Sequence, residues 1–201
     1  ANHCAKFIAS DDARTGKLEK NPIHRDMLFA AEAAKLKFIL NVVIDSDKKI
    51  INAFAGHYIK AHLKGCDFVR QLTEVKAAEA DIVITSNGGY PLDQNIYQAV
   101  KGMTAAEACV RNGGVIIMAA ECRDGHGGEE FYRWFANASS PAEVAERISH
   151  IAQDKTVADQ WQAQILARVL LKARVIMVSE EFNSRIIRDM HMIYAPSLER
   201  A

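Results

Sequence analysis

Two segments of the chain carry polar residue types at a spacing that could do chemistry. Ser86–Pro91 reads SNGGYP, and its backbone amides, with the start of the helix expected after it, could hold a carboxylate or a phosphate. Glu121–Gly128 reads ECRDGHGG and places an acid, a thiol, a cation and an imidazole close together. The pair Gly88 and Gly89 is equally well explained as the positive-φ part of an ordinary turn, so both interpretations of the first segment stay open.

Three residues just after the first segment could bind an anion. Tyr97, Gln98 and Lys101 fall in a stretch with helical periodicity, where Tyr97 and Lys101 share one face and Gln98 lies one turn from Lys101. An ammonium group and an amide at this spacing can bind a carboxylate. The competing interpretation places Lys101 on a solvated helix surface.

The other candidate residues have plainer explanations. A catalytic His126 would require an orienting acid and a substrate, and a polar loop accounts for it as well. Cys122 has no recognisable base, which favours a packed small side chain. Trp161 fits either an amphipathic anchor on the sheet or the wall of a pocket. No HExxH pattern or i, i+4 pair of histidines occurs, so structural roles are expected from the residues alone for His3, His24, His57, His62, His150 and His191.

Alternating strands and helices must position these residues. Short apolar runs predict strands over 80–85, 114–120 and 174–179, and helical periodicity fills the segments between them. Segments 37–45 and 49–55 predict a hairpin, preceded by a helix that Asn21 caps and Pro22 opens. The pattern predicts an α/β fold, with a mostly parallel sheet, helices on both faces and an antiparallel hairpin. Further helices are expected over 58–78 with a joint near Gly65, 92–111, 129–136, 160–172 and 181–190, and one beginning at Ser140.

Composition and charge exclude several classes of protein. The 201 residues are 49% hydrophobic and 25% charged, which fits about one domain with a buried core. Lys plus Arg and Asp plus Glu both number 25, and this zero net charge argues against nucleic acid or an anionic membrane as a partner. No apolar run approaches the roughly 20 residues of a membrane span, and no signal-peptide pattern is present. The 4 well-separated cysteines favour a reducing, cytoplasmic setting.

Several stretches resemble the nickel-dependent lactate racemase family. They are GGYPLDQNIYQAVKG at Gly88–Gly102, the Asn2-His3 pair, and DARTG at Asp12–Gly16 ahead of Asn21-Pro22. The similarity extends over nearly all 201 residues, and it is to the C-terminal half of proteins with two α/β domains and an active site in the cleft between them. The resemblance implies that residues 1–20 form an interdomain or cleft segment, that 21–201 form the C-terminal α/β domain, and that the N-terminal domain is absent from this chain.

The resemblance also implies a cofactor and site residues. Members of the family use nickel held by a pincer, a pyridinium-3,5-bisthiocarboxylic acid mononucleotide tethered to a lysine, and His3 matches the histidine that ligates the nickel. Gln98 and Lys101 match the polar pair that faces the substrate carboxylate, and Tyr97 and Trp161 match aromatic residues that line the same pocket. The acid/base histidines and the tethering lysine belong to the N-terminal half. No catalytic residue is therefore expected in this chain, which is expected to be inactive alone.

The implied reaction interconverts D- and L-lactate, or a related 2-hydroxy acid, by hydride transfer to and from the pyridinium ring. The implied partners are the N-terminal domain, the small 2-hydroxy acid and cofactor-maturation proteins. Two other classes stay open: a small-molecule or anion-binding α/β domain that uses segment 86–93, and a non-catalytic interaction domain that docks a partner through its first 20 residues. Nothing in Gln98, Lys101 or Trp161 selects the side chain of the 2-hydroxy acid.

Overall fold

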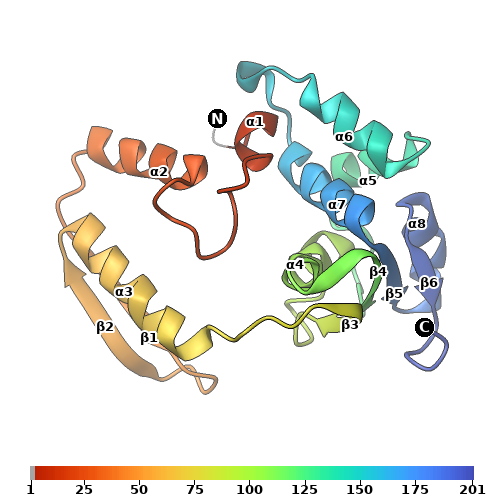
Figure 1. The fold of residues 1–201 in the computed structure, drawn as a ribbon, viewed down its shortest axis with the longest axis horizontal. Coiled ribbons are helices and arrows are strands. Elements are labelled where there is room, and N and C mark those ends of the chain that lie inside the picture. Colours follow the sequence, from red (N-terminus) through yellow and green to blue (C-terminus); the bar gives the residue numbers. More distant parts are fainter. Residues whose placement is uncertain (1–2) are drawn as a thin grey trace. The chain divides into compact units, whose positions relative to one another are not determined.

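The chain divides into two compact units. The computed structural model describes residues 3–201 (Figure 1). One unit, here called the hairpin unit, comprises residues 9–76, and the other, the C-terminal unit, comprises residues 3–8 and 77–201. Residues 3–8 group with the C-terminal unit, so these compact units divide at 8/9 and 76/77, whereas the expected division after residue 20 stays a prediction.

The C-terminal unit is built on one parallel sheet. Its four strands are hydrogen-bonded in the order β3-β4-β5-β6, and all three pairings are parallel. Helices flank this sheet, as the alternation of apolar strands with helical segments predicted. The elements are α1 (Ala5–Ile8), β3 (Ala80–Ser86), α4 (Ile96–Glu107), β4 (Val110–Ala119), α5 (Glu129–Ala136), α6 (Pro141–Ser149), η1 (Gln153–Lys155), α7 (Gln160–Lys172), β5 (Arg174–Val178), η2 (Glu181–Asn183), α8 (Ser184–Asp189) and β6 (Ile193–Ala195).

A continuous core lies between this sheet and its helices. Phe131 and Phe135 of α5 are fully buried, and so are Met118 of β4 and Leu166 of α7. Each of these side chains contributes about 1.5–3 kcal/mol when its apolar surface leaves water. The core therefore fixes α4, α5 and α7 on the sheet.

The edge strand β3 is less buried than its apolar sequence predicted. Val83 packs against the core, whereas Ile82 and Ile84 are 59% and 64% exposed. Successive side chains of a strand point to opposite faces, so only one face of β3 reaches the core. An apolar run alone does not distinguish an edge strand from a central one.

The hairpin unit consists of a two-stranded sheet with helices. It contains α2 (Pro22–Ala33), β1 (Ile39–Ile44), β2 (Ile50–Gly56) and α3 (Tyr58–Thr73). The strands pair antiparallel and α3 packs along both of them, which confirms the predicted hairpin (Figure 1). The predicted cap is also confirmed, since Asn21 accepts hydrogen bonds from the first turn of α2.

Three local predictions differ from the structure. The single turn α1 at the start of the chain and the strand β6 are not among the elements expected from the sequence. Both elements are too short for a periodic pattern to develop. Helix α3 continues through Gly65 without a joint, and a Cβ atom there would lie 3.4 Å from the ring of Phe54, so the glycine permits close packing of α3 on β2.

None of the helices between residues 3 and 201 is long and apolar enough to cross a bilayer.

Candidate active site

The first turn of α4 is tied to the loop at residues 121–128. The side chain of Asn95 accepts a hydrogen bond from the backbone N–H of Gln98 at 3.0 Å. The N–H groups of Ile96 and Tyr97 donate to two backbone carbonyls of the loop, at 3.0 and 3.1 Å. Because these donors are occupied, they are not available to an anion. The start of this helix is therefore not available to a carboxylate or phosphate, and anion binding by the amides of 86–91 stays a prediction.

Lys101 and Gln98 form a polar pair on α4. The ammonium Nζ of Lys101 donates to Gln98 Oε1 at 2.6 Å, at an exposed position. None of the ion pairs found among residues 3–201 includes Lys101, so its charge is not matched by a carboxylate within that range. A positive charge beside an amide N–H₂ group is a suitable receptor for a carboxylate.

An aromatic corner joins α4 to α7. The ring centroids of Tyr97 and Trp161 lie 6.0 Å apart at 88°, and Tyr97 contacts the buried Phe131 edge-on at 5.3 Å. The side-chain amide of Gln162 donates to the backbone carbonyl of Tyr97 at 2.6 Å and holds the two helices together. Burial, followed by the nearby charge of Asp159, raises the pKa of Tyr97 above its ordinary value. Tyr97 is thus a neutral hydrogen-bonding group in this corner at physiological pH.

His3 also contacts Trp161. Its imidazole centroid is 5.3 Å from that of the indole, with the rings tilted by 37°, and the His3 side chain is exposed. The adjoining α1 anchors it, because Cys4, Ala5 and Ile8 are buried against the C-terminal unit. Asn2, the other residue of the Asn-His pair, lies outside the described residues.

The five residues predicted from the resemblance therefore form two adjoining groups. One is a ring series, in which His3 and Tyr97 each contact the ring of Trp161. The other is the Gln98–Lys101 pair, and α4 carries both this pair and Tyr97. The arrangement can bind a small carboxylate beside an aromatic wall and offer one imidazole to a metal.

His126 has a structural explanation. Its Nδ1 accepts the N–H of Gly128 at 3.1 Å, so the neutral ring carries its proton on Nε2, which lies 3.5 Å from Glu129. The ring also stacks on Tyr132 at 5.1 Å. These contacts close the loop onto α5. The interpretation of His126 as part of a polar loop agrees with them better than a catalytic role does.

Cys122 is not a nucleophile in this structure. Its side chain is fully buried, and burial raises the pKa of the thiol to about 12. A thiol that keeps its proton at physiological pH and cannot be reached from solvent is inert. The prediction of a packed small side chain agrees with this environment.

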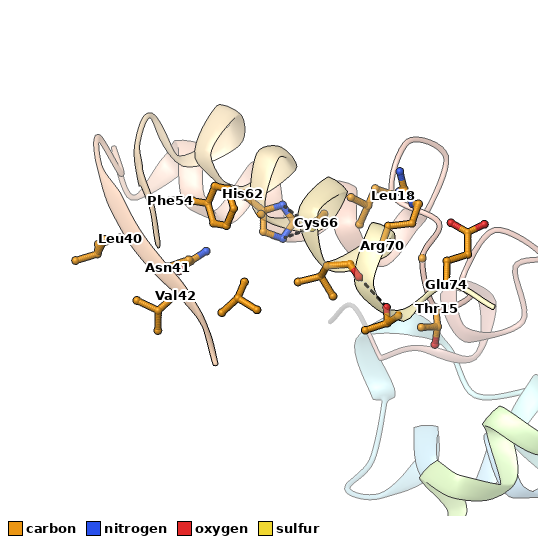
Figure 2. A pocket seen from close by; sticks show the side chains of 15 residues that line it. Thr15, Leu18, Leu40, Asn41, Val42, Phe54, His62, Cys66, Arg70 and Glu74 are labelled. Atoms are coloured by element: carbon orange, nitrogen blue, oxygen red, sulfur yellow. Dashed lines mark hydrogen bonds between the residues drawn. The ribbon is translucent and has the colours of Figure 1, made fainter. Parts of the chain in front are cut away.

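The hairpin unit contains a separate cavity of about 1050 Å³ between β1, β2, α3 and the loop at residues 15–18, which precedes α2 (Figure 2). His62 and Cys66 line it one turn apart on α3, with Nε2 and Sγ separated by 3.5 Å. His24 stacks on His62 at 5.5 Å, and burial, together with the charge of His62, lowers the pKa of His24. None of the five residues predicted for the site lines this cavity.

No group of three or more His, Cys, Asp or Glu side chains that could hold a metal ion occurs among residues 3–201.

Sequence reasoning missed the side chains that hold the site in place. They are the capping Asn95, the two amides of Gln162 and Gln164 on α7, and Arg168, which forms two hydrogen bonds to Glu107 of α4 at 2.8 and 2.7 Å. Asn95 could have been found as an N-cap before a helical pattern. The α7 residues carry no such signal, because their partners are far away in sequence.

The chain is similar to several known proteins. Residues 75–201 match the family model described as "Lactate racemase C-terminal domain". The whole chain is 62% identical to a lactate racemase of Thermoanaerobacterium thermosaccharolyticum and 55% identical to one of Lactiplantibacillus plantarum, and covers 47% of each. The chain therefore spans about half the length of these relatives.

Two solved structures are also similar. The lactate racemase apoprotein of Thermoanaerobacterium thermosaccharolyticum superimposes with a TM-score of 0.97 at 61% identity, over 99% of this chain and 48% of that one. A protein from Thermotoga maritima superimposes with a TM-score of 0.59 at 16% identity, over 88% of this chain, and shares the fold alone.

Proposed function

The chain belongs to the lactate racemase family, and from this membership we propose that it supplies the substrate-carboxylate site and one nickel ligand of an enzyme that interconverts D- and L-lactate or a related 2-hydroxy acid. The observation that carries the proposal is the pairing of Lys101 with Gln98 on the helix that also carries Tyr97, together with the contacts of Trp161 with Tyr97 and with His3. An anion receptor, an aromatic wall and an exposed imidazole lie in one region of the C-terminal unit.

The side chains of this chain that could bind a metal fit a cofactor that itself supplies most of the ligands of its nickel. His3 presents a single exposed imidazole, and among residues 3–201 no cluster of three ligating side chains competes with it. A nickel pincer with sulfur and carbon donors needs one further ligand of this kind, and imidazole suits nickel. When bound, such a pyridinium mononucleotide would accept the Cα hydride of the 2-hydroxy acid and return it.

The residues of this chain would then bind and orient the substrate. The Lys101 ammonium would pair with the substrate carboxylate, and the Gln98 amide would donate a second hydrogen bond to it. Tyr97 and Trp161 would cover the apolar side of the substrate and keep water from it. The general acid and base are assigned to histidines of the N-terminal half, so this chain alone would bind but not convert the substrate.

The N-terminal half is the principal partner we assign to this chain. The relatives are about twice as long, and the hairpin unit lies outside the match to the C-terminal domain, apart from its last residues. Large apolar side chains of this unit are exposed, including Phe29 at 70% and Leu40 at 64%. A two-stranded sheet with such a surface needs further elements to cover it. We therefore assign the hairpin unit to the structure that the N-terminal half completes.

Cofactor-maturation proteins and a cytoplasmic location belong to the same proposal. All four cysteines are free thiols, which supports a reducing compartment.

A chiral assay of lactate by the nickel-loaded full-length protein tests the proposed activity. We expect conversion of D- to L-lactate and of L- to D-lactate, and loss of conversion in His3→Ala. Lys101→Met should raise KM for lactate by at least tenfold, because it removes the charge that binds the carboxylate, whereas Lys172→Met, on α7, should leave KM unchanged. A loaded protein that changes neither lactate nor any other 2-hydroxy acid would overturn the proposal.

A further inference from the structure

Helix α7 begins with an unusual run of amide side chains. Gln160 and Gln162 flank Trp161 in the sequence QWQAQ, Gln164 follows two residues later, and Gln160 and Gln162 are 0% and 1% exposed. Burying an amide costs free energy unless the amide is hydrogen-bonded. Buried amides are therefore expected to bond to a neighbouring element and hold it in place. Gln162 holds α4 through the carbonyl of Tyr97.

Gln164 reaches the opposite end of the sequence. Its Nε2 donates to the backbone carbonyl of Ala5 at 3.0 Å, and its Oε1 is buried with no partner among the described residues. Only the donor half of this amide is therefore used within the described part of the chain.

Helix α1 needs this bond more than a longer helix would. It is a single turn, closed by the N–H groups of Phe7 and Ile8 on the carbonyl of Cys4, both at 3.1 Å. An isolated helix of one turn is unstable in water, so α1 exists because it is docked. The docking consists of the buried Cys4, Ala5 and Ile8 and the bond from Gln164.

The register of this contact determines where His3 lies. Trp161 and Gln164 are three residues apart on α7 and so project from neighbouring positions on its surface. His3 and Ala5 are two residues apart at the other side of the contact. The bond to Ala5 therefore holds the backbone two residues from His3 against the helix that carries Trp161, and the His3 and Trp161 rings lie 5.3 Å apart.

We propose that Gln164 is a positioning residue that docks α1 on α7 and thereby holds the imidazole of His3 beside Trp161. The consequence for nickel rests on the proposed function, in which His3 is the ligand. The docking itself does not depend on that assignment. Helix α7 would thus carry the aromatic wall of the substrate site through Trp161 and hold the metal ligand His3 in place through Gln164.

Hydrogen exchange measured on the cofactor-free full-length protein tests the docking. Gln164→Glu keeps the size of the side chain but replaces its donor by an acceptor facing the Ala5 carbonyl, and Gln164→Met removes the polar group altogether. In both variants the amides of Phe7 and Ile8 should exchange about tenfold faster, while those in the last two turns of α4 keep their protection. Gln162→Met is the matched control, because it releases α4 and should leave the exchange of residues 4–8 unchanged. Unchanged exchange at residues 4–8 in Gln164→Glu would overturn the proposal.

Nickel retention by the loaded full-length protein after gel filtration tests the consequence. We expect Gln164→Glu to retain several times less nickel than the wild type and His3→Ala to retain the least. Faster exchange at residues 4–8 combined with full nickel retention in Gln164→Glu would overturn the positioning role. Full retention in His3→Ala would instead refute the ligand assignment of the proposed function, and the exchange result would still decide whether Gln164 docks α1.

Discussion

The two units of this chain differ sharply in how they use their apolar residues. In the C-terminal unit, Phe131, Phe135, Met118 and many other side chains are fully buried in one core. In the hairpin unit, Ala61 is the only hydrophobic residue of 9–76 that is buried, although its strands are as apolar as those of the parallel sheet. Local sequence patterns are therefore enough to form a hairpin and a helix. A buried core forms only where further elements cover the apolar face of the sheet.

The largest expected effect on stability comes from a comparison of two phenylalanines, one in each unit. Phe135→Ala should destabilise the C-terminal unit by about 3–5 kcal/mol, because it leaves a cavity beside Phe131. Phe29→Ala, at a position 70% exposed in the hairpin unit, should change the stability by less than about 0.5 kcal/mol.

Urea unfolding of the 201-residue chain, followed by far-UV circular dichroism, measures both variants, because this signal reports both units. The fluorescence of Trp134 and Trp161, which lie in the C-terminal unit, reports that unit alone and isolates the effect of Phe135→Ala. Equal destabilisation by the two substitutions would contradict the contrast.

A smaller effect is expected from ion pairs. Glu107 and Arg168 join α4 to α7 with side chains only 14% and 27% exposed, so Glu107→Ala should cost about 2 kcal/mol by leaving a half-buried guanidinium without its partner. Asp67→Ala breaks the exposed pair with Arg70 on α3 and should cost less than about 0.5 kcal/mol. The midpoints of urea unfolding at low and high salt compare them, and a strong salt dependence at Glu107 would show that its pair is solvated.

Helix caps should behave alike in the two units. Asn95→Ala and Asn21→Ala each remove a side-chain oxygen that accepts first-turn N–H groups, and each should cost about 1 kcal/mol of local stability. Hydrogen exchange of the first turns of α4 and α2 measures this. A much larger loss at Asn95 would show that the loop at 121–128, which packs on this residue, depends on it as well.

The smallest expected effect on stability at neutral pH comes from the thiol of Cys122. Because burial raises the pKa of Cys122 to about 12, the folded state keeps a proton that the unfolded thiol loses near its ordinary value of 9. The folded state then binds more protons, so this contribution is constant below pH 9 and stability falls as the pH rises from about 9 to 12. Unfolding free energies of wild type and Cys122→Ala across this range should diverge only above pH 9.

Alkylation compares the same thiol with one in the hairpin unit. At pH 8, iodoacetamide should modify the partly exposed Cys66 readily and Cys122 only after unfolding. Modification of Cys122 in the folded chain at the rate of Cys66 would show that the loop at 121–128 opens to solvent.

Much of the fold could be predicted because its signals are local. The cap and Pro22 at the start of α2, the two hairpin strands and the strand-loop-helix units around β3 and β4 all follow from neighbouring residues. The exposure of Ile82 and Ile84 could not be predicted, because it depends on which strand lies at the edge of the sheet.

The candidate site divides in the same way. The helical spacing of Tyr97, Gln98 and Lys101 was enough to place the polar pair, which the structure shows as a direct hydrogen bond. His3 had no signal of its own, since on the residues alone it was one histidine among seven. Its assignment as a ligand comes from the resemblance and stays a proposal.

The sequence by itself determined the class of fold, the capped helices, and the spacing of an ammonium group, an amide and a tyrosine along α4. Capping, periodicity and turn chemistry act over a few residues, so the sequence contains them completely. Only the tertiary structure decided that His3 lies beside Trp161, that Gln164 holds Ala5, and that the chain divides at 76/77. Those contacts join residues as many as 159 positions apart, and only the packing of α1 and α7 in the C-terminal unit brings them within bonding distance.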